Sequence, residues 1–212
     1  MRRRLIFIVS APTGVGKTTL CKAIEGRIDG VRRVITHTTR KKRKEEREAE
    51  GADYYFISKQ EFQKRIKEEM FVEWAEVHGN LYGTSKKALH DVLEDGYDAV
   101  LSIDVQGAKN IKEEFPYAVL IFLLPPSFEE WMRRLKGIYK KDNVLRLKNA
   151  LIELEKLFFF DYFVVNDSIE QAIDDLKCIV LAERQKIDAS TLDLQNKISE
   201  LIVKLKGELR NE

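Results

Sequence analysis

A glycine-containing turn near the start of the chain has residues suited to holding phosphate groups. It covers residues 10–18 (SAPTGVGKT), directly after the apolar run 5–9, and a stretch with helical spacing follows. Glycines let backbone N–H groups approach phosphate oxygens, Lys17 adds a positive charge, and the Thr18 hydroxyl can reach Mg²⁺. The turn departs from the G-x-x-x-x-G-K-[ST] pattern only at the first glycine, where Ala11 stands. We therefore predict a nucleoside triphosphate site whose phosphate-binding residues are Ala11, Pro12, Thr13, Gly14, Val15, Gly16, Lys17, Thr18 and Thr19.

Four apolar runs predict the sheet that positions this turn. They are residues 5–9, 99–103, 119–124 and 162–165, and segments of helical period separate them. Continuous apolar runs are typical of parallel strands that are buried on both faces. The sequence therefore predicts an α/β fold: a parallel sheet that carries the phosphate loop and is flanked by helices.

Length and charge limit the remaining possibilities. The 212 residues contain no Pro-, Gly- or Ser-rich linker, so we expect one domain, and a net charge of +2 does not favour non-specific nucleic-acid binding. Cys21 and Cys178 are far apart and lack metal-binding spacing, which gives a disulfide no support. The first apolar run is too short for a signal peptide or a membrane span, so we expect a cytoplasmic protein without a membrane partner.

Three segments differ in pattern from the predicted core, which comprises residues 1–35, 97–132 and 150–185. Residues 36–96 combine charged runs with aromatic-polar stretches and are interpreted as a substrate-binding insertion. Residues 133–149 contain a short basic segment between two predicted helices and are interpreted as a short lid. Residues 186–212 continue in helical period; their apolar spacing fits either a short coiled-coil seam between two copies or a helix packed on its own core.

Several further segments resemble the guanylate kinase family of P-loop nucleoside monophosphate kinases in order and spacing. The resemblance covers about residues 4–185 and rests on residues 36–43 (THTTRKKR), 51–54 (GADY), 71–75 (FVEWA), 79–84 (GNLYGT), 103–107 (IDVQG), 124–127 (LPPS) and 165–167 (VND). It implies transfer of the γ-phosphoryl group of MgATP to GMP or dGMP, which yields ADP and GDP. The implied ligands are ATP, GMP and Mg²⁺ bound with ATP, and residues 36–96 become the GMP-binding insertion.

The chemistry of guanine agrees with the residues that the resemblance assigns to it. Guanine presents two donors, N1–H and the 2-amino group, on one edge, and a single carboxylate such as Glu73 can accept both. Guanine O6 is an acceptor, which the hydroxyls of Thr84 and Thr36 can satisfy, whereas adenine would leave these groups unpaired. The predicted GMP-binding residues are Thr36, Arg40, Arg43, Tyr54, Glu73, Tyr82, Thr84 and Asp104, of which Arg40, Arg43, Tyr54 and Tyr82 form the predicted phosphate cage.

Roles on the ATP side follow from the same resemblance. Lys17, Arg134 and Arg146 are the predicted catalytic residues, and Asn166 and Asp167 are assigned to the adenine side. Asp104 follows a predicted strand; it is either a Walker-B-type aspartate that reaches Mg²⁺ through water, together with Thr18, or a plain cap of the strand end.

Three departures from the family pattern leave alternatives open. Ser102 stands where an acidic residue is usual; Glu46 and Glu48 compete for one acidic position; and the segment containing Lys140 and Lys141 lacks the usual lid arginines. A related kinase with another phosphorylated acceptor therefore stays an alternative. A second alternative is a scaffold module that no longer transfers phosphate, against which Gly14, Gly16, Lys17 and Thr18 argue.

Overall fold

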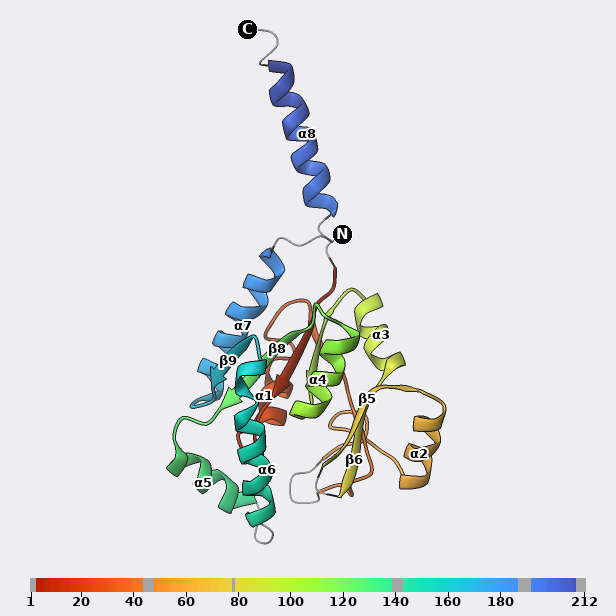
Figure 1. The fold of residues 1–212 in the computed structure, drawn as a ribbon, viewed down its shortest axis with the longest axis vertical. Coiled ribbons are helices and arrows are strands. Elements are labelled where there is room, and N and C mark those ends of the chain that lie inside the picture. Colours follow the sequence, from red (N-terminus) through yellow and green to blue (C-terminus); the bar gives the residue numbers. More distant parts are fainter. Residues whose placement is uncertain (1–2, 44–47, 78, 139–142, 187–191, 209–212) are drawn as a thin grey trace.

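A five-stranded parallel sheet forms the centre of the molecule (Figure 1). The computed structural model describes residues 3–43, 48–77, 79–138, 143–186 and 192–208. The strand order is β2-β7-β1-β8-β9, and every pairing in this sheet is parallel. The strands are β1 (Ile6–Ser10), β2 (Val31–Arg33), β7 (Asp98–Ser102), β8 (Val119–Leu124) and β9 (Tyr162–Val165). The four predicted apolar runs therefore form strands, while β2 had no clear signal in the sequence.

Alternate residues of the central strand face two separate hydrophobic clusters. Phe7 and Val9 pack in one cluster with α1 (Lys17–Ala23) and α7 (Ile169–Gln185), whereas Ile6 and Ile8 pack in the other with α3 (Lys86–Glu94) and α4 (Val105–Glu114). Helices thus cover both faces of the sheet, as parallel strands require. This arrangement confirms the predicted α/β fold.

A second, smaller sheet lies within the insertion. Its strand order is β4-β3-β6-β5, and its own core consists of Phe62, Phe71 and Leu81. The aromatic-polar stretch forms an antiparallel hairpin of two of these strands. The elements are β3 (His37–Thr38), β4 (Tyr55–Phe56), α2 (Lys59–Lys67), β5 (Phe71–Val77) and β6 (Asn80–Ser85).

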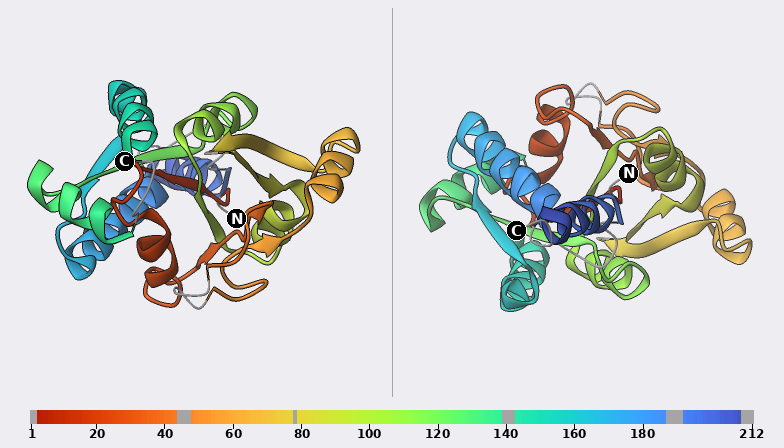
Figure 2. Two further views of the ribbon diagram at one scale, coloured as in Figure 1. Left: turned by 90° about the horizontal axis from the view of Figure 1, so that it is seen from below. Right: turned by 90° about the horizontal axis from the view of Figure 1, so that it is seen from above.

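Two further helices, α5 (Phe128–Ile138) and α6 (Asn143–Glu155), lie on the side of the body opposite the insertion helix α2 (Figure 2). A 3-10 turn (Leu157–Phe159) follows α6 and leads into β9. Lys140 and Lys141 lie outside the described residues, as do the side chains of residues 136–146, including Arg146.

The last helix, α8 (Leu192–Glu208), extends away from the body (Figure 1). Its side chains Ile198, Leu201 and Leu205 are exposed. The alternative in which this helix packs on the chain's own core is therefore wrong for these three residues. Among the described residues, no helix has the length and apolar composition needed to cross a membrane.

A buried ion pair joins α7 to the start of the central sheet. Arg184 Nε donates to Asp98 Oδ2 over 2.8 Å, and the other oxygen of this fully buried carboxylate accepts from Leu5 N over 2.9 Å. Removing one partner of a buried pair is costly because the remaining charge stays desolvated.

We expect Arg184→Met to lower the free energy of unfolding by roughly 3 kcal/mol. Chemical denaturation at pH 7 measures this loss. Lys87→Met, which breaks the exposed pair with Asp91, is the control and should leave the free energy of unfolding nearly unchanged. Equal losses in the two variants would contradict the structural role given to Arg184.

Candidate active site

At two positions the phosphate loop has a backbone conformation that only glycine adopts easily. Gly14 and Gly16 have φ angles of 82° and 101°, in the left-handed region. Gly16 is the N-cap of α1 and provides no side chain to cap it, so the first turn of this helix is suited to an anion. The predicted loop therefore has the strand before it, the helix after it and the conformation that phosphate binding requires.

Side chains from α5 and from the segment after β9 donate hydrogen bonds to carbonyl groups of this loop. Trp131 Nε1 donates to the carbonyl of Thr13 over 2.9 Å, and Asn166 Nδ2 donates to the carbonyl of Val15 over 2.7 Å. A Cβ atom on Gly14 would lie 2.7 Å from Leu135 Cδ2, so α5 packs directly on the glycine. The side chain of Asn166 thus supports the loop, and its predicted contact with adenine stays a prediction.

Arg134 lies beside the same loop but is engaged by neighbouring groups. Its guanidinium donates to the carbonyls of Asn166 (2.7 Å) and Asp167 (3.1 Å) and to Glu130 Oε1 (2.7 Å). In this conformation Arg134 connects α5 to the end of β9. Its predicted contact with the transferring phosphoryl group would require these bonds to be exchanged, and that role remains a prediction.

Lys17 and Asp104 meet at the carboxyl end of β7. Lys17 Nζ donates to the carbonyl of Ile103 over 2.9 Å. Asp104 Oδ1 accepts from the N–H groups of Gln106 (2.7 Å) and Gly107 (2.9 Å), which makes Asp104 the N-cap of α4. Asp104 therefore caps the helix that follows the strand, where the sequence had offered a cap of the strand end, and a water-mediated contact with Mg²⁺ remains a prediction.

The predicted guanine carboxylate, Glu73, is buried opposite Thr84, which was also predicted to contact guanine. Glu73 and Thr84 face each other across β5 and β6, and Thr84 Oγ1 donates to Glu73 Oε1 over 2.6 Å. Extending the β3–β6 register by one residue puts Thr36 opposite Thr84. Burial, with a smaller contribution from the charge of Asp104, raises the pKa of Glu73 to about 7.

Gly107 gives the Glu73 carboxylate the room that it occupies. A Cβ atom at this position would lie only 2.6 Å from Glu73 Oε2. The first turn of α4 therefore lies directly against the carboxylate of Glu73 on β5. The sequence motif contains this glycine, but only the structure gives the physical reason for it.

The residues predicted to bind the GMP phosphate gather around an internal anion. Both terminal nitrogens of Arg40 donate to the carboxylate of Glu48, over 2.5 and 2.9 Å, and the N–H of Arg43 donates to it over 2.7 Å. The guanidinium of Arg40 lies 5.4 Å from the ring centre of Tyr54, whose ring lies 5.9 Å from that of Tyr82. Arg40 and the backbone of Arg43 thus bind Glu48, and the two tyrosines extend from Arg40, while binding of a phosphate by these residues remains a prediction.

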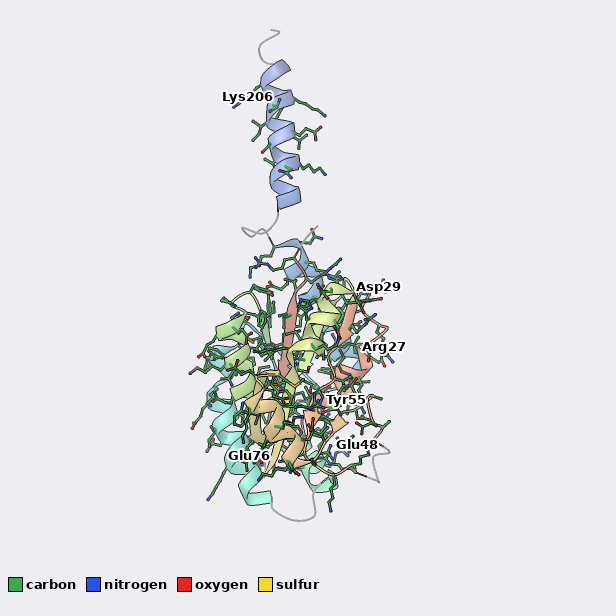
Figure 3. The ribbon with its side chains drawn as sticks, turned by 90° about the vertical axis from the view of Figure 1, so that its right-hand side faces the viewer. Arg27, Asp29, Glu48, Tyr55, Glu76 and Lys206 are labelled. Atoms are coloured by element: carbon green, nitrogen blue, oxygen red, sulfur yellow. The ribbon has the colours of Figure 1, made fainter. Side chains whose placement is uncertain are left out.

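Glu48 was one of two candidates for an acidic position near GMP. Burial opposes its ionisation, but the bonds from Arg40 and the Arg43 backbone outweigh this effect and lower the pKa of Glu48. The rival, Glu46, lies outside the described residues. Figure 3 labels Glu48 in the lower half of the body, far from Lys206 on α8.

The loop before Tyr54 is anchored to the core. Lys22 of α1 forms an ion pair with the buried carboxylate of Asp53, and a guanidinium nitrogen of Arg33 donates to the carbonyl of Ala52. Asp53 also accepts from Ala49 N over 2.7 Å. These contacts fix the position of Tyr54 relative to the phosphate loop.

One acidic residue at the phosphate loop was missed from the sequence. Burial raises the pKa of Glu153 on α6 to about 7, and the charge of Lys17 and the backbone of Thr13 lie close enough to act in the opposite direction. A glutamate in an amphipathic helix has no distinguishing pattern, so only the fold reveals this contact. Trp131 was missed for the same reason.

Comparisons with known proteins agree with this geometry. The guanylate kinase family profile matches residues 2–183. The guanylate kinase of Geobacter metallireducens is 45% identical over 186 residues (86% of this chain, 91% of the relative), and that of Thermotoga maritima is 40% identical over 205 residues (95% and 96%). The crystal structure of guanylate kinase from Anaplasma phagocytophilum superposes with a TM-score of 0.73 at 34% identity, covering 87% of this chain and 88% of that chain. On this evidence the chain belongs to the guanylate kinase family of nucleoside monophosphate kinases.

Proposed function

We propose that the protein transfers the γ-phosphoryl group of ATP to GMP or dGMP, and that the residues described above divide the work between two nucleotide sites. The observation that carries the acceptor's identity is the buried Glu73 carboxylate with the Thr84 hydroxyl at 2.6 Å. This pair matches the donor-donor-acceptor edge of guanine. Arg40, Arg43 and the two tyrosines would bind the GMP phosphate, which would take the place of Glu48 on Arg40.

On the ATP side, the phosphate loop would bind the β- and γ-phosphates. Lys17 would leave the carbonyl of Ile103 to follow the charge of these phosphates, while Arg134 and Arg146 would stabilise the transferring group. Closure of the insertion and lid would exclude water from the reaction.

A magnesium ion bound with ATP fits the oxygen donors at this place. The Thr18 hydroxyl follows Lys17 at the start of α1, and the bonds that cap α4 go only to Oδ1 of Asp104. Hydroxyl and carboxylate oxygens, with phosphate oxygens and water, suit the small hard cation. Mg²⁺ would supply charge neutralisation on the β- and γ-phosphate oxygens.

Two proposals concern the protein's surroundings. We propose a homodimer through α8, whose exposed Ile198, Leu201 and Leu205 suit a seam between two helices. Light scattering of the full chain and of a chain ending at residue 186 tests this dimer. If the full chain and the shortened chain are both monomers, the proposal is contradicted. We also place the protein in the cytoplasm, where its proposed substrates ATP and GMP occur.

A coupled assay of ADP release tests the acceptor. With MgATP, GMP and dGMP should be phosphorylated, and AMP, UMP and CMP should react roughly 10³-fold more slowly or worse in kcat/KM, because they leave buried polar groups unpaired. Comparable turnover of AMP would overturn the acceptor assignment. ATP binding without turnover of any of these nucleotides would favour the scaffold alternative.

The raised pKa of Glu73 predicts how GMP binding depends on pH. Guanine's two donors need the ionised carboxylate, so below pH 7 binding must first remove a proton from Glu73. The KM for GMP should therefore rise by up to roughly tenfold per pH unit as the pH falls below 7. In Glu73→Gln, the KM should be high throughout and lose this pH dependence, while the KM for ATP stays close to wild type. An unchanged pH profile in the variant would remove Glu73 from the guanine site.

Gly107→Ala tests the space beside Glu73 without touching the proposed contacts with guanine. The added methyl group must displace the carboxylate, so the KM for GMP should rise about tenfold or more. Ala108→Gly changes a neighbouring residue of α4 and serves as the control for helix stability. If both variants raise the KM for GMP equally, the effect belongs to the helix and not to the position of Glu73.

A further inference from the structure

Two carbonyl groups of the phosphate loop accept hydrogen bonds from buried side chains outside the loop. Trp131 Nε1, on α5, donates to the carbonyl of Thr13 over 2.9 Å, and Asn166 Nδ2, just after β9, donates to the carbonyl of Val15 over 2.7 Å. Both donor residues are only 6% exposed. Arg134 of α5 donates in turn to the carbonyl of Asn166 over 2.7 Å, so the two supports are joined to each other.

These two bonds determine the direction in which two N–H groups of the loop point. The carbonyl of Thr13 shares a peptide group with the N–H of Gly14, and the carbonyl of Val15 shares one with the N–H of Gly16. The structure has no cis peptide bond among the described residues, and in a trans peptide the C=O and N–H bonds point in opposite directions. The two glycine N–H groups therefore point away from the side chains that hold the carbonyls.

The side of the loop toward which these N–H groups point is suited to an anion. Neither the N–H of Gly14 nor that of Gly16 has a hydrogen-bond acceptor among the described residues. Lys17 extends away from the supports to the carbonyl of Ile103, just after β7, and β7 and β9 lie on opposite sides of β1 in the sheet. Free N–H donors beside an ammonium group form a concave site for an anion such as phosphate.

The two glycines also leave the space that the supports occupy. A Cβ atom on Gly14 would lie 2.7 Å from Leu135 Cδ2, and a Cβ atom on Gly16 would lie 2.6 Å from Asn166 Nδ2. Leu135 follows Trp131 by four residues on α5, so both side chains lie on the same face of that helix. The supports can thus approach the loop because its two left-handed residues lack side chains.

We propose that Trp131 and Asn166 are positioning residues for the donor nucleotide, because their bonds to the loop carbonyls aim the N–H groups of Gly14 and Gly16 at the phosphates of ATP. The proposal rests on ATP being the phosphoryl donor. It gives the amide of Asn166 a task different from its predicted contact with adenine. When a phosphate oxygen accepts from a glycine N–H, the carbonyl of the same peptide becomes a stronger acceptor, so phosphate binding and the supporting bonds strengthen each other.

Calorimetric titration of the whole protein with the non-hydrolysable imido analogue of ATP and Mg²⁺, without GMP, tests the role of Trp131. Trp131→Phe keeps an aromatic ring but removes the indole donor, so the dissociation constant should rise about tenfold. The chain has two tryptophans, and Trp74→Phe makes the same substitution at the exposed one on β5. This control should bind the analogue like the wild type, and equal dissociation constants in the two variants would overturn the role of Trp131.

A second control separates the hydrogen bond from a loss of packing. Ile121→Val removes a methyl group from the cluster that contains Trp131 and leaves the loop untouched. This variant should bind the analogue like the wild type even though chemical denaturation shows a loss of stability. If Ile121→Val weakens binding as much as Trp131→Phe does, the effect belongs to the core and the proposal is wrong.

Inorganic tripolyphosphate with Mg²⁺ tests Asn166, because this probe contains no base. It should bind the wild type, and Asn166→Asp, which keeps the shape of the side chain but removes the donor, should raise its dissociation constant about tenfold. Failure of the wild type to bind tripolyphosphate would contradict the aiming of the N–H groups at phosphates. A variant that binds the ATP analogue more weakly but tripolyphosphate normally would assign Asn166 to adenine instead. This variant carries the test by itself if Trp131→Phe does not fold.

The indole N–H signal of Trp131 in the proton NMR spectrum reports on the supporting bond directly. Trp74→Phe leaves Trp131 as the only tryptophan, which identifies the signal. Addition of the ATP analogue with Mg²⁺ should move it to lower field as the bond to the Thr13 carbonyl strengthens, whereas adenosine, which has no phosphate, should not. An indole signal that stays in place when the analogue binds would contradict the coupling between the phosphates and this bond.

Steady-state kinetics distinguish this proposal from the proposed function. In Trp131→Phe the KM for ATP should rise and kcat should fall about tenfold, while the KM for GMP stays within about twofold of wild type. Equal increases in the two KM values would show a general distortion and overturn the positioning role. The binding and NMR measurements need no GMP, so failure of the wild type to phosphorylate GMP would count against the proposed function alone.

Discussion

The turn between β1 and α1 is the constraint on which the rest of the site depends. Two left-handed glycines leave this backbone with few bonds of its own, so its shape depends on its surroundings. Side chains from α5 and the segment after β9 bind its carbonyl groups, and its lysine binds the end of β7. Each of these segments also carries residues assigned to a nucleotide, so the loop and both nucleotide sites share one set of supports.

Two buried carboxylates, Glu73 and Glu153, lower the free energy of unfolding at neutral pH. Glu73 and Glu153 each have a pKa near 7 in the folded protein, above the value of 4.5 for an exposed carboxyl group. A raised folded pKa means that the folded state holds the proton more tightly, so stability falls as the pH rises from about 4.5 through 7. Each residue then costs on the order of 3 kcal/mol at pH 8. Removing these carboxylates would stabilise the fold, but loss of Glu73 would also remove the proposed acceptor of guanine's donors.

Patterns local in the sequence predicted much of this structure. The sequence predicted the phosphate loop, the four apolar strands, and Glu73 and Thr84 as residues of one site. Each prediction rests on a pattern that lies within a few residues: a turn motif, a buried run or a family motif. The strand β2 has three residues and little pattern. Contacts that depend on distant segments were not predictable: Trp131 lies 118 positions after Thr13, and nothing in α5 marks it. Asp104 is an intermediate case. The sequence allowed either a cap or a contact with Mg²⁺, and the structure shows Asp104 as the N-cap of α4.

An internal carboxylate occupies groups that are predicted to bind phosphate. Glu48 accepts from both terminal nitrogens of Arg40 and from the N–H of Arg43. Cationic groups and N–H donors that converge without an anion would repel one another or stay unpaired, so this carboxylate keeps them in place. The same bonds lower the pKa of Glu48, so it stays ionised. In the proposed function the GMP phosphate would therefore have to displace Glu48, and the acceptor site would exchange one anion for another.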